Sequence, residues 1–400
     1  MNILFIANRF PYPPYRGDKL KIFNLAQRLS RKHDLYLITF IQNKNDYQHV
    51  EILNKYFKHI SLIYLPKYLS IIKCIFGMFS SKPFQVIYFR SKKLKRKLQK
   101  LLDDYRIDVI HTQHLRMSQY SYDLNNYKRI LDLPDAYSLY WERRSRVKRN
   151  FLTKLFDKIE FSRIIKYEKK IINEFDLNLV CSEEDKNFLK KYHNTDNIEI
   201  LPNGVDLTQF QASGHDYSDN NRIIFTGNMD YAPNVDAVLY FVENIFPLIL
   251  KKYPQLVFYI VGQKPVKKIL KLNCRNVIVT GFVKDLAMEY NKSAVAVSPI
   301  RFGAGTLNKV LEPMSMGIPV VSTEVGFKGL GVESGEGVIL ATNEVQFSEA
   351  IIKLLDTEEY RKVVGQKGKV SIENKFSWDK ISQMLENYFM KISGEKTSGS

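Results

Sequence analysis

Short apolar runs that alternate with segments of helical length are the feature that most constrains how this chain can fold. The runs are rich in Val and Ile and lack the polar alternation of a strand with one face in water. In chain order they lie at residues 3–7, 35–40, 109–111, 177–182, 222–227, 256–262, 277–283, 295–300 and 319–323. Continuous apolar strands of this kind are typical of parallel sheets covered by helices on both faces, so the pattern predicts an α/β fold.

The alternation starts twice, which predicts two domains. Residues 2–10, "NILFIANRF", and residues 221–229, "NRIIFTGNM", are equivalent openings, each a first strand that runs into a polar turn. Between them, "PNG" at 202–204 predicts a turn, and the polar residues 211–221 mark a boundary. Because 400 residues exceed what one core usually holds, we expect two doubly wound domains. Ligands would bind in the cleft at the carboxyl ends of their strands.

The charge and the cysteines limit the possible partners and location. The net charge is +18, from 60 Lys and Arg against 42 Asp and Glu, which favours nucleic acid, nucleotides or an anionic membrane as partners. Cys74, Cys181 and Cys274 match no metal or redox spacing, so a reducing cytoplasm is the simplest location. The opening run soon meets Arg9, which predicts a first strand and not a signal peptide.

Residues 302–323, "FGAGTLNKVLEPMSMGIPVVST", predict a site for an anion. Gly303, Ala304 and Gly305 let the backbone turn tightly and expose its N–H groups. Thr306 is a candidate cap for the helix that follows, whose amino end attracts negative charge. These features together suit a phosphate. An ordinary loop–helix–strand connection is the alternative.

The two halves together resemble the glycosyltransferases of the GT-B fold and the GT4 type, in particular bacterial sugar transferases of exopolysaccharide and O-antigen clusters. The resemblance rests on the 302–323 motif, on "PNGVD", "GNMDYAPNVDAV" and "GFVKDL", and on the closing "FSWDKISQMLENYF". It implies two Rossmann-like, doubly wound parallel-sheet domains that face each other across a cleft. Residues 1–204 would bind the acceptor and residues 205–377 the nucleotide sugar. A helix at about 378–392 would pack back on the first domain, and residues 393–400 would form a tail.

By this resemblance, the second domain binds the donor, a nucleotide-diphosphate sugar. The Gly303–Thr306 loop would receive the diphosphate on backbone N–H groups, and Lys309 would add a positive charge. Glu312 lies three residues further, on nearly the same helix face, where a carboxylate suits the hydroxyl groups of a ribose. The other donor-binding residues that the resemblance implies are Gly227 and Asn228 beside the phosphates, and Phe282 and Val283 beside the base.

The chain departs from the family pattern at three places. Ala304 stands where relatives usually carry the first of two glutamates, the one that contacts the donor sugar. "MDYAPN" follows "GN" where many relatives have an Arg and a Lys, so Lys309 and Arg301 would take more of the phosphate neutralisation. Pro313 falls inside the expected helix, which is tolerable if the helix begins near Asn308.

In the first domain, the resemblance implies residues that contact the sugar or the acceptor. Gly17 follows the first strand, where a small residue lets backbone N–H groups approach the donor, and an ordinary turn is the alternative. His111 and His114 end a strand where the family places a histidine, and a buried structural histidine is the alternative. Asp135 follows the next strand and completes the catalytic candidates. No metal is expected, because the histidines have no matching carboxylate or cysteine set.

The implied reaction transfers a sugar with retention of its anomeric configuration and needs no cofactor beyond the donor substrate. The leaving phosphate oxygen would accept the proton of the acceptor hydroxyl while basic side chains and helix ends neutralise the diphosphate. The expected acceptor is a saccharide or lipid-linked molecule of cell-surface polysaccharide synthesis. Two alternatives stay open: a sugar-nucleotide epimerase of the same fold, and a basic nucleic-acid-binding protein. No RRM, KH or helix-turn-helix signature supports nucleic acid.

Residues 60–80 form the most apolar stretch. Pro66, Lys67 and Lys73 interrupt it, so the stretch holds no uninterrupted apolar run long enough to span a bilayer. It predicts either a core helix of the first domain or an interfacial helix. In the second case, together with the basic run at 92–100, it would dock the protein peripherally on anionic lipid at the inner face of the cell membrane.

Overall fold

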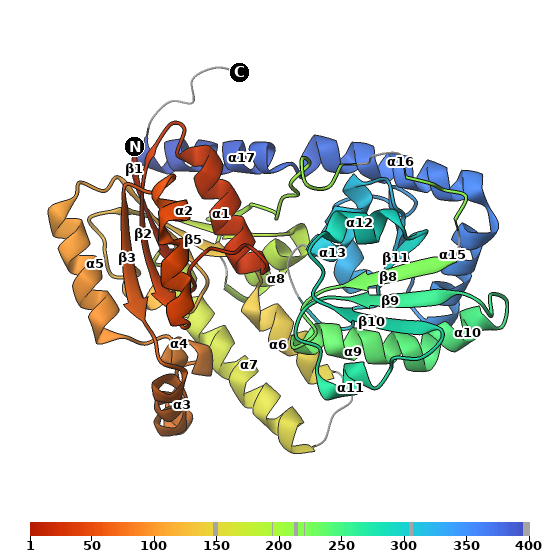
Figure 1. Ribbon diagram of the computed structural model, residues 1–400. Helices are drawn as coiled ribbons and strands as arrows, with labels where there is room; N and C mark the ends of the chain where they lie inside the picture. The colour runs from red at the N-terminus through yellow and green to blue at the C-terminus, as the bar shows by residue number, and fades with distance from the viewer. Residues whose placement is uncertain (147–150, 194, 212–214, 220, 304–306, 395–400) are drawn as a thin grey trace. The chain divides into compact units, whose positions relative to one another are not determined.

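The chain forms two compact units, each built on one parallel sheet (Figure 1). The computed structural model describes residues 1–146, 151–193, 195–211, 215–219, 221–303 and 307–394. The first unit comprises Met1–Pro202 and Asp379–Ser400, and the second comprises Asn203–Trp378. All strand pairs within the two sheets are parallel over the described residues, which confirms the predicted α/β class.

The sheet of the first unit has the strand order β3-β2-β1-β4-β5-β6-β7. Its strands are β1 (Asn2–Ala7), β2 (Asp34–Ile41), β3 (His59–Tyr64), β4 (Val109–Gln113), β5 (Lys128–Leu133), β6 (Leu177–Val180) and β7 (Ile198–Ile200). Its helices are α1 (Gly17–Leu29), α2 (Val50–Asn54), α3 (Lys67–Phe76), α4 (Phe84–Tyr88), α5 (Lys92–Asp104), α6 (Tyr137–Arg146), α7 (Phe151–Ile172) and α8 (Glu183–His193), with the 3₁₀ turns η1 (Lys44–His49), η2 (Gly77–Phe79) and η3 (Ser118–Tyr120).

The sheet of the second unit has the strand order β10-β9-β8-β11-β12-β13. Its strands are β8 (Arg222–Thr226), β9 (Val257–Val261), β10 (Val277–Gly281), β11 (Val295–Ser298), β12 (Val320–Ser322) and β13 (Val338–Leu340). Its helices are α9 (Ala232–Tyr240), the π-helical η4 (Phe241–Ile245), α10 (Phe246–Leu250), α11 (Lys267–Leu270), α12 (Leu286–Asn291), α13 (Asn308–Ser315), α14 (Glu324–Phe327), α15 (Glu344–Asp356) and α16 (Glu358–Lys375).

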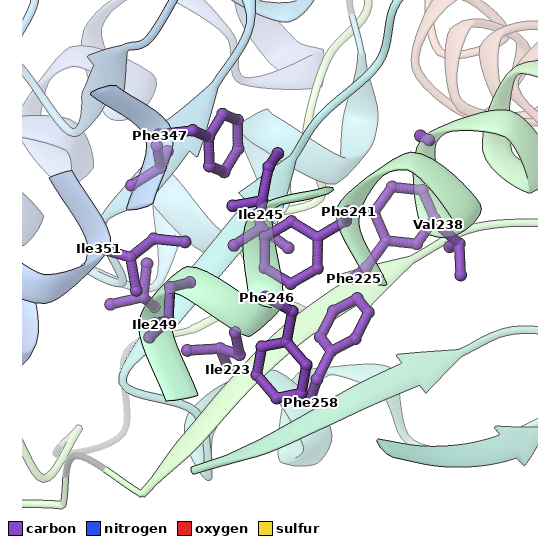
Figure 2. Packing of buried hydrophobic residues seen from close by; sticks show 14 of the residues in the cluster. Ile223, Phe225, Val238, Phe241, Ile245, Phe246, Ile249, Phe258, Phe347 and Ile351 are labelled. Atoms are coloured by element: carbon purple, nitrogen blue, oxygen red, sulfur yellow. The ribbon is translucent and has the colours of Figure 1, made fainter. Parts of the chain in front are cut away.

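Successive residues of the strands in the second unit enter two different cores, because side chains alternate between the faces of a sheet. Ile223 and Phe225 of β8 pack with the apolar side chains of α9, η4, α10 and α15. Figure 2 shows this core around Phe241, Phe246 and Phe258. Ile224, between the first two, packs on the opposite face against α13 and α16. The sheet is therefore a middle layer between two layers of helices.

One helical stretch of the described chain, Ala232–Leu250, is long and apolar enough to cross a membrane. Its apolar residues Val238, Phe241, Ile245 and Ile249 are fully buried in the core of the second unit. Their burial identifies the stretch as a core helix of the folded unit.

The last helix, α17 (Trp378–Ser393), completes the first unit from the far end of the chain. Its residues Ile381, Leu385 and Phe389 are fully buried, and the Phe389 ring lies 6.0 Å from the ring of His111. At its surface, Glu386 of α17 forms a salt bridge with Lys32, in the turn after α1. The core of the first unit thus includes residues from both ends of the sequence.

Four strands have no counterpart among the apolar runs. β5 was expected only from its place before Asp135. β7 and β13 have three residues each, too few to show a period, and both lie at the edges of their sheets. β3 (His59–Tyr64) takes up the start of the apolar stretch 60–80, which we interpreted as a helix only. In the structure this stretch is a strand followed by the helix α3, since Pro66 separates the two.

The carboxyl ends of β8 and β9 approach so closely that only glycine fits. A Cβ atom on Gly262 would lie 1.7 Å from the backbone oxygen of Gly227. The two segments are held together by the Gly227 N–H, which donates to the Val261 carbonyl at 3.0 Å.

We expect Gly262→Ala to lower the free energy of unfolding by about 2 kcal/mol or more, because the added methyl group must push backbone apart. Thermal and urea unfolding measure this loss. Gly17→Ala is the matched control, since a Cβ atom there meets nothing within 4 Å. Equal stability of the two variants would contradict the close approach.

Candidate functional site

Polar residues gather at the carboxyl edge of the sheet in the second unit, and we call them the C-terminal cluster. They are Thr226, Gly227 and Asn228 at the end of β8, Asn234 on α9, Tyr290 on α12, and Lys309 and Glu312 on α13. They come together because the strands are parallel, so that the loops after them and the helices that follow meet at one edge.

Asn234 joins the turn after β8 to helix α13. Its side-chain N–H donates to the carbonyl of Asn228 at 2.9 Å, and its Oδ1 accepts from Nζ of Lys309. A Cβ atom on Gly227 would lie 2.5 Å from the Asn234 side chain, so the turn needs glycine at this position. The contacts fix Lys309 beside the Gly227–Asn228 turn, as the resemblance implied.

Lys309 is a mostly buried cation with no acidic partner. Its Nζ lies 5.1 Å from the centre of the Phe225 ring, and it forms no salt bridge within the described part of the chain. Burial lowers its pKa from 10.5 to about 8, although the charge of Glu312 opposes this change. A buried ammonium group without a counter-ion is costly, and an anion bound beside it would offset that cost.

Glu312 is held by a chain of hydroxyl groups. The Tyr290 hydroxyl donates to Oε2 of Glu312 at 3.0 Å and lies 2.6 Å from Oγ1 of Thr226. Burial raises the pKa of Glu312 to about 7. The carboxylate of Glu312 therefore lies near Lys309. It can accept hydrogen bonds from a diol while the lysine binds an anion.

The Gly303–Thr306 loop is only partly described. Ala304, Gly305 and Thr306 lie outside the described residues, and Gly303 is buried. Helix α13 begins at Asn308, as expected, and its N-cap residue is Leu307, whose side chain forms no cap hydrogen bond; the expected cap, Thr306, lies outside the described residues. Pro313 lies inside α13, five residues after its start, and so removes one backbone hydrogen bond of this helix.

Arg301 is already engaged by another part of the second unit. Its guanidinium group donates to both carboxylate oxygens of Asp236, at 2.8 and 2.6 Å, and lies over the Tyr240 ring. A bidentate pair of this kind leaves Arg301 little freedom to neutralise phosphate, contrary to our expectation. At the end of β10, by contrast, the Phe282 side chain is 57% exposed and Val283 is partly buried. These two residues can still face a ligand.

A second group of charged residues lies at the carboxyl edge of the sheet in the first unit, and we call it the N-terminal cluster. It comprises Arg9 after β1, Asp18 on α1, His114 and Arg116 after β4, and Asp135 after β5. The structure thus brings two of the three expected catalytic residues, His114 and Asp135, into one place. It adds Asp18, Arg9 and Arg116.

Asp18 and His114 form the centre of this cluster. Asp18 forms a salt bridge with Arg9 and lies 4.0 Å from Nε2 of His114. Burial alone would raise the pKa of Asp18, but the charge of Arg9, with those of Arg16 and Arg116 adding to it, lowers it far below its usual range. His114 has a φ of 76°, rare for a residue with a side chain, and its buried Nδ1 has no hydrogen-bond partner in the described structure. Strain and an unused donor or acceptor are typical of functional sites.

Asp135 shares its surroundings with a second buried carboxylate. Burial, with the charge of Asp185 adding to it, raises the pKa of Asp135 to about 7. Asp185 accepts a hydrogen bond of 2.6 Å from the Ser182 hydroxyl, and its backbone N–H donates to the same hydroxyl, which caps the start of α8. Two acids of this kind, only one of which is fixed by a cap, can hold or release a proton near neutral pH.

His111 has a structural role. It is fully buried, and its Nε2 lies 3.2 Å from Asp132, which also forms a salt bridge of 2.8 Å with the buried Lys21. Lys21 donates further to the carbonyl of Leu201 at 3.0 Å. A substrate contact for His111 is not compatible with this burial, so our expectation for it is corrected. The alternative of a buried structural histidine holds, with Nε2 beside Asp132 and no hydrogen-bond partner for Nδ1 in the described structure.

Gly17 begins helix α1, and a Cβ atom on it would meet nothing within 4 Å. The first unit therefore does not need glycine here for packing. Packing within the described part of this unit does not explain why residue 17 is a glycine. A ligand that approaches the backbone at this position would explain it.

The sequence analysis missed several residues of both clusters, namely Asn234, Tyr290, Arg116 and Asp185. Asn234 lies within the quoted motif "GNMDYAPNVDAV", which could have indicated it. The others reach their cluster through contacts distant in sequence, such as the hydrogen bond between Tyr290 and Glu312. Among the described residues, no group of three or more His, Cys, Asp or Glu side chains is arranged to hold a metal ion.

Comparison with known proteins gives consistent matches for both units. Residues 22–209 match the family model described as "Glycosyltransferase Family 4", and residues 220–357 match "Glycosyl transferases group 1". An "Uncharacterized 44.6 kDa protein in cps region" of Klebsiella pneumoniae is 24% identical over 368 residues, which cover 88% of this chain and 90% of that protein.

Two further proteins are similar over part or all of the chain. The "Capsular polysaccharide biosynthesis glycosyltransferase CapM" of Staphylococcus aureus is 30% identical over 127 residues, 30% of this chain and 33% of CapM. The solved structure of Anabaena Alr3699/HepE in complex with UDP superposes with a TM-score of 0.69 at 14% identity, over 98% of this chain and 100% of that one. The same Anabaena protein has been solved with UDP-glucose.

The raised pKa of Glu312 predicts a specific change of stability with pH. A carboxyl group that titrates at 4.5 in the unfolded chain and at about 7 in the fold stabilises the fold fully below pH 4.5, and this contribution is lost as the pH rises through 7. Glu312→Gln keeps an acceptor for Tyr290 but has no charge. At pH 8 we expect the variant to be more stable than the wild type, by up to about 3 kcal/mol, and near pH 5 much less so.

Urea unfolding at the two pH values measures this difference. Glu349→Gln, a change on the exposed face of α15, is the matched control and should leave the pH dependence unchanged. A Glu312→Gln variant that is less stable than the wild type at pH 8 would contradict the burial of the charge.

Proposed function

Because the chain is a glycosyltransferase of the GT-B fold and the GT4 type, we propose that it transfers a sugar from a nucleotide-diphosphate sugar to a hydroxyl group of a saccharide or lipid-linked acceptor. The anomeric configuration is retained in this proposal. The capsule protein CapM supports a place in polysaccharide synthesis, and the UDP complexes of the Anabaena protein support a uridine nucleotide as the leaving group.

The observation that carries the proposal is the pair of Lys309 and Glu312 on one helix of the C-terminal cluster. Lys309 is a half-buried cation that forms no salt bridge among the described residues, and Glu312 is a half-buried acceptor three residues further on. A nucleoside diphosphate presents the two complementary groups, an anionic diphosphate and a ribose diol. In this proposal Lys309 binds the diphosphate and Glu312 binds the diol, while the exposed Phe282 lies against the base.

The N-terminal cluster supports an acceptor site in the first unit. Arg9 and Arg116 give it positive charge, while His114 is neutral near pH 7 because burial and Arg116 lower its pKa. A neutral imidazole can accept a hydrogen bond from a sugar hydroxyl, and Asp135 can do the same when it is ionised. In the proposed reaction, the bond from the anomeric carbon to the diphosphate oxygen breaks as the acceptor oxygen bonds to that carbon. The acceptor proton passes to the leaving phosphate.

Binding to a panel of nucleotides tests the function directly. UDP, GDP and ADP, each free and as a sugar donor, are added during thermal unfolding, where a ligand at about 100 times its dissociation constant contributes about 2.7 kcal/mol. Mass spectrometry then detects transfer from the stabilising donor to candidate saccharides, and NMR compares the anomeric proton of the product with that of the donor. If no nucleotide stabilises the protein, the proposal fails. An inverted product would overturn the retaining reaction.

We expect Lys309→Met to weaken UDP binding by about tenfold to a hundredfold, because a charge-assisted hydrogen bond in a buried site is lost. The wild-type affinity should also fall above pH 8, by about tenfold at pH 9, since the lysine loses its proton with a pKa of about 8. Isothermal titration calorimetry at pH 7 and pH 9 measures both effects.

Lys309→Arg is the matched variant for that test. Arginine keeps its charge at pH 9, so the decrease in affinity above pH 8 should disappear even if the longer side chain weakens binding overall. The same pH dependence in wild type and Lys309→Arg would show that another group binds the diphosphate.

Gly17→Ala should keep the stability of the wild type but lower the rate of sugar transfer by about tenfold or more, because a methyl group would keep the ligand from the backbone. Steady-state kinetics with the preferred donor measures the rate. An unchanged rate would mean that Gly17 is an ordinary helix start.

A further inference from the structure

Helix α3 exposes its apolar side chains and buries a polar one. Ser70 is its fully buried residue, whereas Ile71, Ile72 and Ile75 are each about half exposed. Phe76 is 82% exposed, and Phe79 of the following turn η2 is 95% exposed. A helix on the surface of a globular protein usually has the opposite arrangement, with its apolar side chains facing the core.

The first turns of α7 show the same inversion. Asp157 and Glu160 are 1% exposed, while Phe151 is 78% exposed and Leu155 and Ile159 are almost half exposed. One oxygen of each buried acid has a partner: Oδ1 of Asp157 accepts from Arg144 at 3.0 Å, and Oε1 of Glu160 accepts from the backbone N–H of Phe84 at 2.8 Å. The buried side of these turns of α7 is therefore polar, and the side exposed to water is apolar.

These two helices are joined into one surface through α4 (Figure 1). The ring of Phe84 stacks on that of Phe156 at 5.5 Å, and Arg163 of α7 donates to the carbonyl of Met78 in η2. We call this face the apolar surface. Its exposed side chains are Tyr68, Leu69, Ile71, Ile72, Ile75, Phe76, Met78, Phe79, Phe151, Leu155, Phe156 and Ile159.

The charge around the apolar surface has one sign. The 44 residues from His59 to Leu102 contain ten Lys and Arg and no Asp or Glu. α3 is tied to the start of the basic helix α5, since Lys73 donates to the carbonyl of Arg90 at 2.8 Å. On α7, Lys154 and Lys158 are exposed beside the apolar residues. An apolar patch of this size rimmed by basic side chains is complementary to a surface that is both apolar and anionic.

We infer that the apolar surface docks the first unit on an anionic lipid bilayer. The phenylalanines and isoleucines of α3, η2 and α7 enter the boundary between head groups and acyl chains, and the lysines bind lipid phosphates. With ten residues, α3 is too short to span the bilayer, so it lies in the interface. The inference does not depend on the proposed donor, because all of these residues belong to the first unit.

Flotation of the full chain with lipid vesicles tests this inference. Vesicles of phosphatidylglycerol should carry the wild type to the top of a density gradient, and vesicles of phosphatidylcholine should carry much less. The double variant Phe76→Ser and Phe79→Ser should bind the anionic vesicles at least about tenfold more weakly, since two large apolar side chains no longer leave water. Its unfolding temperature should not fall, because both side chains are exposed.

The matched control changes two exposed apolar residues of the second unit, Val345→Ser and Val370→Ser, and should bind vesicles as the wild type does. Equal flotation of the wild type and the phenylalanine variant would overturn the inference. A second outcome would also overturn the inference: the wild type does not float but forms a dimer, and the phenylalanine variant is a monomer. The apolar surface would then be an interface between two copies of the chain. UDP binding by the variant, measured in parallel, keeps this outcome separate from a failure of the donor site.

Discussion

The parallel direction of the strands is the constraint on which the rest of this structure depends. In each unit, all strands of the described sheet end at the same edge, so every loop that follows a strand meets its neighbours there. Segments more than 80 residues apart, such as Asn228 and Lys309, become neighbours without any long-range motif in the sequence. The buried layers of helices on both faces leave that edge as the place where polar groups can gather.

The two clusters differ in how their charged side chains are paired. In the N-terminal cluster the acids lie beside cations: Arg9 is paired with Asp18, and Asp135 and Asp185 titrate near neutral pH. In the C-terminal cluster Lys309 forms no salt bridge among the described residues, so a bound anion would offset the cost of its burial. The exposed phenylalanines of the apolar surface are likewise costly in water, and the bilayer that we infer as its partner would offset that cost.

The sequence was sufficient for the fold and for those site residues that lie in local patterns. Apolar runs predict strands because parallel strands are buried on both faces, and the resemblance to the family indicated Lys309 and Glu312, which the structure places on one helix. The sequence was insufficient where a residue makes its contacts with side chains that lie far away along the chain. His111 could not be told from a catalytic histidine until Lys21 and Asp132 were seen to enclose it, and Arg301 looked free until Asp236 was seen to bind it. β7 and β13 were too short to show any period.

The return of α17 to the first unit has a consequence for how the protein is made. Buried residues such as Phe389, and the hydrogen bond from Tyr388 to the carbonyl of Ile200, close the core of the unit that leaves the ribosome first. That unit therefore stays incomplete, with the side chains that α17 covers open to water, until the whole of the second unit has been translated. The second unit, whose segments are continuous from Asn203 to Trp378, can finish folding before it.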